Sequence, residues 1–246
     1  MPQYAQRLSD LPKLQGTLKL DRTLLRDTAV EKLREFIGSG LIPEGTKISE
    51  REVSEMLGIS RMPARDALMT LEHEGLVENR PDGRYVIQLT EEDVRNFLQV
   101  RAALERVAAE LAARNINEEG RAALLARLRD LEDAVARKDP DLCAEKDIAL
   151  HQAIWQQARN PQLLRFLQSM VGVILVLTLR VDHFGGGDVQ RLLSDHRGLV
   201  DIIISGDADA SGRALEQEIK TNAMADALRT FRVPEHREDK GSQPSG

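Results

Sequence analysis

The sequence predicts a mainly α-helical protein: an N-terminal winged helix-turn-helix followed by a C-terminal all-α antiparallel helix bundle. Three observations lead to this prediction. Aromatic residues make up only 3% of the 246 residues, and a chain rich in Leu and Ala favours helices over sheets. Residues 49–76 carry the start and stop signals of two short helices joined by a tight turn. From residue 90 onward, helical periodicity continues with short, well-marked breaks.

The two helices within residues 49–76 have recognisable ends. Ser49 followed by Glu52 is a capping-box signature, which starts the first helix. Gly58 ends that helix, because glycine adopts the left-handed C-terminal conformation without strain. Ser60 is placed to cap the second helix. This arrangement is typical of a helix-turn-helix.

Two arginines stand near the start of the second helix. Arg61 and Arg65 are four residues apart, so both project from one face of the helix. Guanidinium groups in that position can contact phosphates and guanine edges in the major groove of DNA. The motif therefore predicts a DNA-binding head.

The flanking segments complete a winged helix over residues 21–89. Apolar residues at helical spacing predict a first helix over about residues 23–38. Two short β-prone runs, 76–79 and 85–88, flank a Pro-Asp-Gly turn and predict a hairpin. Residues 1–20 lack periodicity, and we expect them to form a flexible arm.

Residues 90–232 are expected to form an all-helical domain. Thr90 followed by three acidic residues is a second N-cap signature, with the acids in the first turn, where the helix dipole favours them. Residues 233–246 are polar and are expected to be a disordered tail. The predicted helices cover residues 94–114, 118–138, 141–159, 162–182, 189–205 and 208–232.

Charge and cysteine content limit the possible functions. The net charge is −6, and residues 1–90 carry 13 Lys+Arg against 14 Asp+Glu. Since DNA-binding domains usually have a basic surplus, this head is only locally basic, and we expect its DNA binding to need a dimer and to be salt-sensitive. Cys143 is the one cysteine, which excludes an intramolecular disulfide and a Cys-rich zinc site. No signal peptide or membrane-spanning run is apparent, so a cytoplasmic setting is expected.

The stretch from Leu33 to Val86, which contains the run LREFIGSGLIPEGTKISEREVSEMLGISRMPARDALMTLEHEGLV, resembles the head of GntR-type bacterial transcription regulators. The helical part resembles the FCD ligand-sensing domain of the FadR-like branch. This resemblance implies a homodimeric repressor or activator whose helical domain senses a small carboxylate. The matching pieces are Arg101-x-x-Leu104-Glu105, Asp147-x-x-x-His151, Asn160-Pro161 and Asp195-His196-Arg197.

The resemblance also implies which residues contact DNA. Arginine forks pair with guanine O6 and N7, and a glycine lets the tip of the wing approach the minor groove closely. Met62 stands where family members vary, so it could tune specificity through a thymine methyl. The alternative is that the arginines only solvate a helix face. The family's DNA-contacting positions fall on Arg51, Ser60, Arg61, Arg65 and Gly83.

A metal site is suggested by Asp147 and His151, which are four residues apart and therefore share a helix face. The family usually adds two histidines from later helices. The first maps to His196, whereas the second falls on Glu218, a departure from the pattern. A carboxylate ligand favours harder ions, so the divalent metal (Zn, Ni, Mn or Fe) stays open. The alternative for each histidine is a packed or surface residue.

Two further residues are candidates for binding the effector. Arg101 is placed to clamp its carboxylate, because a buried guanidinium needs an anionic partner. The alternative is a purely structural pair with Glu105. Asn222, one turn beyond Glu218, could contact the effector or substitute as a ligand.

Three functions are therefore compared. The leading one is a DNA-binding transcriptional regulator whose dimer binds a pseudo-palindromic operator and responds to a small carboxylate. The second is a metal-dependent enzyme acting on a small organic acid, since a bound cation can activate water; no motif, however, places a general base or nucleophile beside the ligands. The third is a scaffold whose winged helix binds protein. The sequence does not name the effector, the operator or the sign of regulation.

Overall fold

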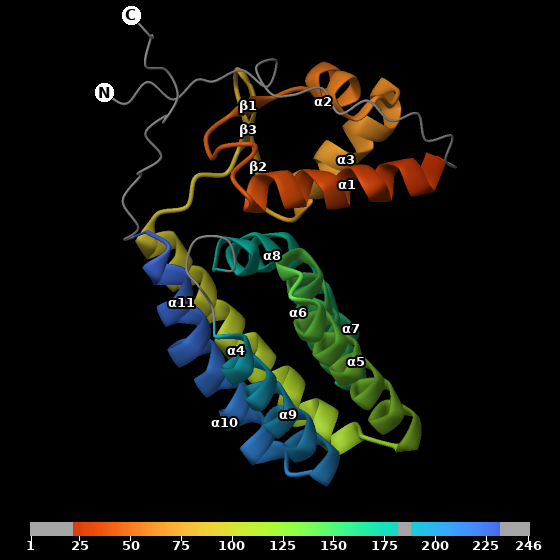
Figure 1. The fold of residues 1–246 in the computed structure, drawn as a ribbon, viewed down its shortest axis with the longest axis vertical. Coiled ribbons are helices and arrows are strands. Elements are labelled where there is room, and N and C mark those ends of the chain that lie inside the picture. The colour runs from red at the N-terminus through yellow and green to blue at the C-terminus, as the bar shows by residue number, and fades with distance from the viewer. Residues whose placement is uncertain (1–21, 182–187, 232–246) are drawn as a thin grey trace, which may run out of the picture.

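The computed structural model describes residues 22–181 and 188–231, so the predicted N-terminal arm and C-terminal tail lie outside the described residues. The fold is mainly α-helical: a small head lies over one end of a helix bundle (Figure 1). The head consists of α1 (Arg22–Gly38), β1 (Lys47–Ile48), α2 (Glu50–Leu57), α3 (Arg61–His73), β2 (Val77–Arg80) and β3 (Gly83–Val86).

The helix ends in the head follow the sequence signals in part. The Ser49 hydroxyl accepts the backbone N–H of Glu52, and Gly58 closes α2 in the left-handed region with φ +66°. Ser60 occupies the N-cap position of α3 with an extended backbone, but its side chain makes no capping hydrogen bond. Ser60 is therefore the N-cap residue, as predicted, but its exposed side chain does not cap the helix.

The wing contains a strand that the sequence did not indicate. The sheet order is β1-β3-β2, all antiparallel, and Lys47 of β1 pairs with Tyr85 of β3. β1 has only two residues, which is too few to show the alternation of apolar and polar residues that indicates a strand. The hairpin turn is also tighter than predicted, because Arg80 pairs directly with Gly83.

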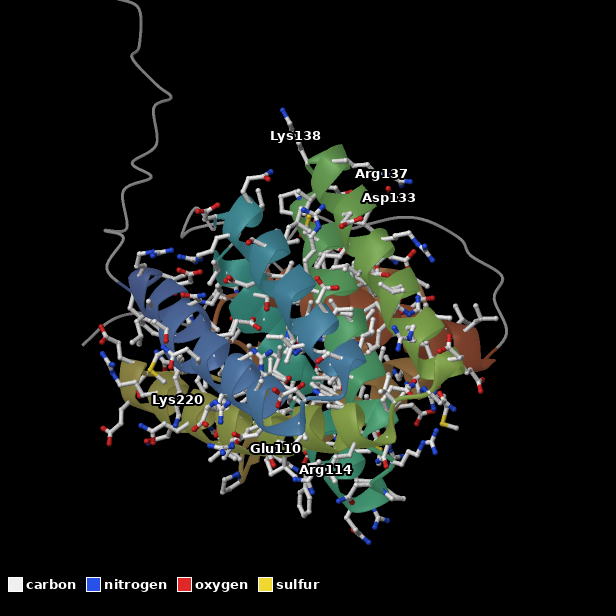
Figure 2. The ribbon with its side chains drawn as sticks, turned by 90° about the horizontal axis from the view of Figure 1, so that it is seen from below. Glu110, Arg114, Asp133, Arg137, Lys138 and Lys220 are labelled. Atoms are coloured by element: carbon white, nitrogen blue, oxygen red, sulfur yellow. The ribbon has the colours of Figure 1, made fainter. Side chains whose placement is uncertain are left out.

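The bundle is built from nine helical segments within the described residues. Thr90 and Asp93 form a full capping box at the start of α4. Figure 1 shows α4, α9, α10 and α11 on one side and α5 and α6 on the other. Figure 2 shows the bundle from below, with charged side chains such as Arg137 and Lys138 directed outward. The segments are α4 (Glu91–Asn115), α5 (Glu118–Arg137), α6 (Pro140–Gln157), α7 (Pro161–Gln168), α8 (Val171–Arg180), α9 (Val189–Ser205), α10 (Ala208–Glu218), a π-helical turn (Ile219–Ala223) and α11 (Met224–Arg229).

The helix predicted over residues 162–182 is wrong: it is two helices, α7 and α8, bent by 45°. The bend lets α8 pack beneath the head. A Cβ on Gly38 would lie 2.6 Å from Leu179, and one on Gly172 would lie 2.7 Å from the Glu74 carboxylate, so both contacts need glycine. Apolar residues continue through the bend, which explains why periodicity alone does not reveal it.

The helix predicted over residues 208–232 is interrupted too. Residues 219–223 form a π-helical turn between α10 and α11. Such turns commonly occur at functional sites, and this one separates Glu218 from Met224.

One hydrophobic core joins the head to the bundle, with fully buried members such as Leu33 and Leu68 in the head and Leu98 and Leu150 in the bundle. This shared core holds α8 against both parts. Among the described residues, no single helix is long and apolar enough to cross a membrane, although the bent pair of α7 and α8 passes that test jointly.

Candidate functional site

The residues predicted to contact DNA lie on one side of the head. Arg51, Arg61 and Gly83 line a single groove, together with Lys47 and Arg84. The groove thus draws cationic side chains from β1, α2, α3 and β3. At the start of α3, the other predicted residues, Ser60, Met62 and Arg65, are exposed.

Acidic side chains hold two of the arginines near this groove. Glu50 Oε1 lies 3.9 Å from Arg65 Nε and 3.4 Å from Arg84 Nη1. Glu72 Oε2 lies 3.2 Å from Arg84 Nε. These acids neutralise part of the positive charge of the arginines. They also hold Arg65 and Arg84 in place, although the head has no basic surplus.

Gly83 is required by the geometry of the wing. Its φ is +141°, in the region that favours glycine, and an added Cβ would lie 2.7 Å from Lys47 Cε. Any side chain here would displace Lys47 from the groove.

A second site lies inside the bundle, where three buried residues from two helices converge. Asp147 and His151 come from α6 and His196 from α9. His196 Nε2 lies 2.7 Å from Asp147 Oδ1 and 3.2 Å from His151 Nε2. Glu218, from the end of α10, has Oε1 4.0 Å from His196 Nε2. The structure therefore brings together Asp147, His151 and His196, three of the four residues predicted to hold a metal, and Glu218 lies beside His196 but outside that group.

The hydrogen bonds of both imidazoles leave the same nitrogen facing the cluster. His196 Nδ1 lies 2.8 Å from the carbonyl oxygen of Leu192, which can only accept. His151 Nδ1 lies 2.7 Å from a carboxylate oxygen of Glu105. With the Nδ1 protons placed toward these acceptors, each neutral ring presents its Nε2 lone pair to the cluster. Histidines oriented by a partner behind them are the usual metal-ligand arrangement.

Asp147 supplies a direct test of whether these residues fit a cation. Its Oδ1 atom is buried and has no hydrogen bond of acceptable geometry, even though His196 Nε2 is close. A buried carboxylate oxygen without a donor is costly. With both imidazoles neutral, one oxygen and two nitrogens converge as a ligand set suited to a divalent ion.

The surrounding charges determine which of these side chains carry protons. Burial lowers the pKa of His196, but Glu218 and Asp147 outweigh burial and raise that pKa to about 10. Burial also lowers the pKa of His151, but Glu105 outweighs burial and raises that pKa. Burial raises the pKa of Asp147, yet His196 brings it down to about 2. Without a metal, the carboxylates therefore keep protons on the imidazoles, and a bound cation would replace those protons.

Glu105 supports the cluster from behind. It is fully buried and accepts hydrogen bonds from Arg101 Nε at 2.5 Å and from Trp155 Nε1 at 3.0 Å, besides its contact with His151. Burial raises its pKa, but Arg101 and His151 outweigh burial and hold the pKa well below its usual range. The ion pair of Arg101 with Glu105, one of the two alternatives, is thus present.

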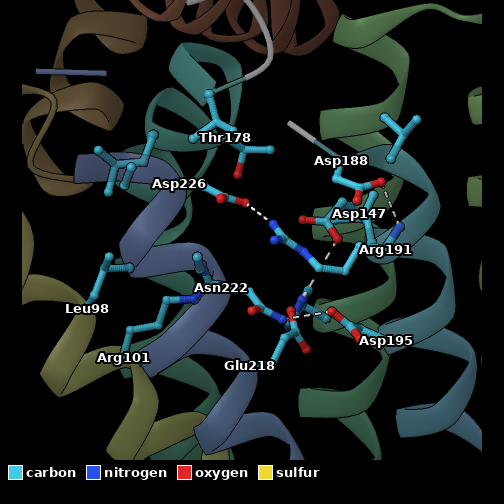
Figure 3. Close-up of a pocket in the computed structure, with 17 residues that line it drawn as sticks. Leu98, Arg101, Asp147, Thr178, Asp188, Arg191, Asp195, Glu218, Asn222 and Asp226 are labelled. Atoms are coloured by element: carbon cyan, nitrogen blue, oxygen red, sulfur yellow. Dashed lines mark hydrogen bonds and ion pairs between the residues drawn. The ribbon is translucent and has the colours of Figure 1, made fainter. Parts of the chain in front are cut away.

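The cluster opens into a cavity of about 100 Å³ (Figure 3). Arg101 also lines this cavity, so its pairing with Glu105 does not remove it from the site. Asn222 lines it as well and donates to Asp195 Oδ2 at 2.8 Å. Polar residues lining the cavity come from α4, α6, α8, α9, the end of α10, the π-helical turn and α11.

Sequence reasoning missed Arg191, Asp195 and Asp226, which line the same cavity. A signal for Asp226 was present, because Glu218, Asn222 and Asp226 recur every four residues. That spacing places them along one helix face. Asp195 directly precedes His196, and Arg191 lies one turn before Asp195.

Comparisons with known proteins cover both parts of the chain. Residues 25–87 match the family model described as "Bacterial regulatory proteins, gntR family". Residues 96–221 match the model described as "FCD domain".

Two curated proteins are similar over most of their length. The chain is 31% identical over 202 residues to the "HTH-type transcriptional repressor RspR" of Escherichia coli, covering 81% of this chain and 87% of that protein. It is 27% identical over 192 residues to the "Gluconate operon transcriptional repressor" of Bacillus licheniformis, covering 76% and 78%.

Solved structures share the fold. "E. coli McbR/YncC" aligns with a TM-score of 0.68 at 19% identity, covering 84% of this chain and 98% of that one. A GntR-family transcriptional regulator from Pseudomonas syringae pv. tomato aligns with a TM-score of 0.51 at 23% identity, covering 91% of each chain.

Proposed function

Because the chain belongs to the GntR family of bacterial transcriptional regulators and carries an FCD domain, we propose that it is a cytoplasmic, homodimeric regulator switched by a small carboxylate. Its dimer binds a pseudo-palindromic operator through the two heads. Binding of the acid in the bundle shifts the population between DNA-competent and DNA-incompetent dimers. The relatives compared above are repressors, and repression is the mode proposed for this chain.

The observation that carries the proposal is the position of α8. Its residues Leu177 and Thr178 line the cavity, while Leu179 packs against Gly38 of the head. One short helix therefore contacts both the ligand cavity and the DNA-binding part. A ligand that moves α8 has a direct route to the position of the head.

In the head, each proposed DNA contact has a distinct role. Arg61 and Arg65 read guanine edges from the exposed start of α3. Arg51 binds a phosphate and Ser60 donates its free hydroxyl to another. Met62, whose side chain is half exposed, packs on a thymine methyl, and Gly83 lets the wing tip approach the minor groove.

In the bundle, Asp147, His151, His196 and Glu218 hold a divalent transition metal. A bound ion offers an open coordination position to a ligand carboxylate. Arg101 pairs with the carboxylate from the α4 side, and Asn222 donates to a ligand hydroxyl or carbonyl. Two nitrogen and two oxygen donors are compatible with Zn, Ni, Mn or Fe.

An enzyme that uses this metal is the alternative. The relatives are transcriptional regulators, and the chemistry of the cavity supports binding: Glu105 is already bound by three donors and so is not available as a base. Binding without turnover is the function that these contacts favour.

Selection of binding sites from random DNA tests the regulator function. The purified full chain, loaded with zinc, should enrich a two-fold symmetric sequence, and its affinity should fall steeply with salt. Failure to enrich any sequence, or binding that persists at high salt, would favour the protein-binding scaffold instead.

A further inference from the structure

Arg191 places a second positive charge in the cavity. It belongs to the first turn of α9, and its Nη2 lies 2.5 Å from Asp226 Oδ2 on α11. Both residues line the cavity, and the ion pair spans it from one helix to the other (Figure 3). We propose that the ligand is a small acid with two anionic groups, and that Arg191 binds the second one. This inference rests on the proposed function and names the ligand class of its pocket.

Arg191 can leave Asp226 without leaving a buried charge unpaired. Asp226, whose side chain is only 13% exposed, is also paired with Arg229 through its other oxygen. Losing the sole partner of a buried carboxylate would be strongly unfavourable. Here a ligand carboxylate that takes Arg191 leaves Asp226 with Arg229. Arg191 can therefore exchange Asp226 for a ligand carboxylate, whereas Arg101 stays paired with the buried Glu105.

The two cations face different ends of the cavity. Figure 3 shows Arg101 and Glu218 together at one end, while Asp226, which holds the Arg191 guanidinium, lies at the other. A single carboxylate on the metal and Arg101 would not reach Arg191. A molecule with an anionic group at each end would contact both.

The other carboxylates that line the cavity already have hydrogen-bond donors among the described residues. Asp188 is occupied by the backbone N–H groups of Gln190 and Arg191, and Asp195 accepts from Asn222. A divalent ion offsets the two carboxylates at the metal site. Arg191, released from Asp226, then has one positive charge available for the second anionic group.

Size and polarity narrow the class further. The cavity has a volume of about 100 Å³, so the ligand has a short backbone. A hydroxyl beside the first carboxylate would chelate the ion and meet the Asn222 amide. The predicted class is therefore a short α-hydroxy dicarboxylic acid.

Matched pairs of acids test this inference with the zinc-loaded full chain. Each pair has the same carbon skeleton and hydroxyl, with one carboxylate replaced by methyl: malate with α-hydroxybutyrate, and α-hydroxyglutarate with α-hydroxyvalerate. Binding is measured by titration calorimetry. For wild type, the dicarboxylate of at least one pair should bind about tenfold tighter or more, as expected for an added charge-assisted hydrogen bond.

Two variants each remove one arginine of α9. Arg191→Gln should abolish the preference for the dicarboxylate and leave the affinity for the monocarboxylate unchanged. Arg197→Gln is the matched control: it removes an ion pair of the same helix, with Glu132, but Arg197 does not line the cavity and does not contact Asp226. It should keep the preference.

The possible failures are distinguishable. Equal binding of both members of every pair by wild type, or an unchanged preference in Arg191→Gln, would overturn the role of Arg191 and leave the carboxylate-sensing function standing. If wild type binds no acid of either kind, both the role of Arg191 and the acid-binding pocket are overturned. DNA site selection still tests the regulator function separately.

Discussion

Arg180, at the end of α8, donates a hydrogen bond from Nη1 to Glu44 Oε1 of the head at 2.6 Å. The other oxygen of Glu44 accepts the backbone N–H of Leu89, just before α4. Arg180 also lies over the Phe231 ring, 4.5 Å from its centroid. Glu44 thus joins the head to the start of the bundle and, through Arg180, to α8, where Arg180 lies two residues beyond the cavity-lining Thr178.

The first prediction concerns this link. Burial raises the pKa of Glu44 and outweighs Arg180, which lowers it. With a raised folded-state pKa, ionised Glu44 contributes no stability at neutral pH. Glu44→Gln should therefore not lower the free energy of unfolding by more than about 1 kcal/mol, the range of a partly exposed ion pair. It should, however, reduce the change in operator affinity that the ligand causes.

That prediction is checked by DNA titration with and without ligand, together with denaturant unfolding. Glu35→Gln, which alters an exposed pair with Lys32 on α1, is the control and should behave like wild type. An undiminished ligand response in Glu44→Gln would show that this link does not transmit the signal.

Arg65 is predicted to be essential for operator recognition. Arg65→Ala removes a guanine contact, which should cost about 1–3 kcal/mol and weaken binding to the selected operator while circular dichroism stays unchanged. Arg127→Ala is the control, because it removes an equal charge from an exposed position on α5. Equal operator affinity in the two variants would contradict the assignment of the recognition helix.

Metal content is predicted to depend on the buried histidines. Untagged wild-type protein should contain about one divalent ion per chain by elemental analysis, as expected for three converging ligand residues with Glu218 close by. His196→Ala should lose it, because His196 contacts both Asp147 and His151. His73→Ala, at an exposed position at the end of α3, should retain it; equal metal in both variants would refute the site.

Glu105 is predicted to be a stability determinant. Glu105→Gln leaves the buried Arg101 without its counterion, which should destabilise the protein by about 3–5 kcal/mol. The metal affinity should fall as well, because His151 loses the partner that orients it. Denaturant unfolding and zinc titration check these effects. Glu110→Gln, five residues along α4 and partly exposed, should change neither by a comparable amount.

Much of the architecture could be predicted because it depends on local signals. Ser49, Gly58 and Thr90 set helix ends through contacts within one turn. Such contacts depend only on residues that are close in the sequence. Long amphipathic helices such as α5 and α9 were placed nearly to the residue for the same reason. The grouping of Asp147 with His196 came from a family resemblance, because nothing local relates residues so far apart.

The features that could not be predicted all depend on packing. The bend between α7 and α8 exists because α8 must cover the underside of α1, and the break carries no Pro or Gly of its own at Ser169 or Met170. Strand β1 forms only because β3 lies beside it. Neither feature has a sequence period to reveal it.

By itself, the sequence determined the fold class, the two-part organisation and the chemical types gathered at each site, because helix caps, periodicity and residue spacing are local properties. Only the tertiary structure decided which nitrogen of His151 and His196 faces the cluster, that Arg101 is held by Glu105, and that Arg191 reaches Asp226 across the cavity. The contacts of His151 with Glu105 and of Arg191 with Asp226 join different helices, whereas those of His196 with Leu192 and of Arg101 with Glu105 lie within one helix in buried surroundings. Their geometry is fixed by how the helices pack.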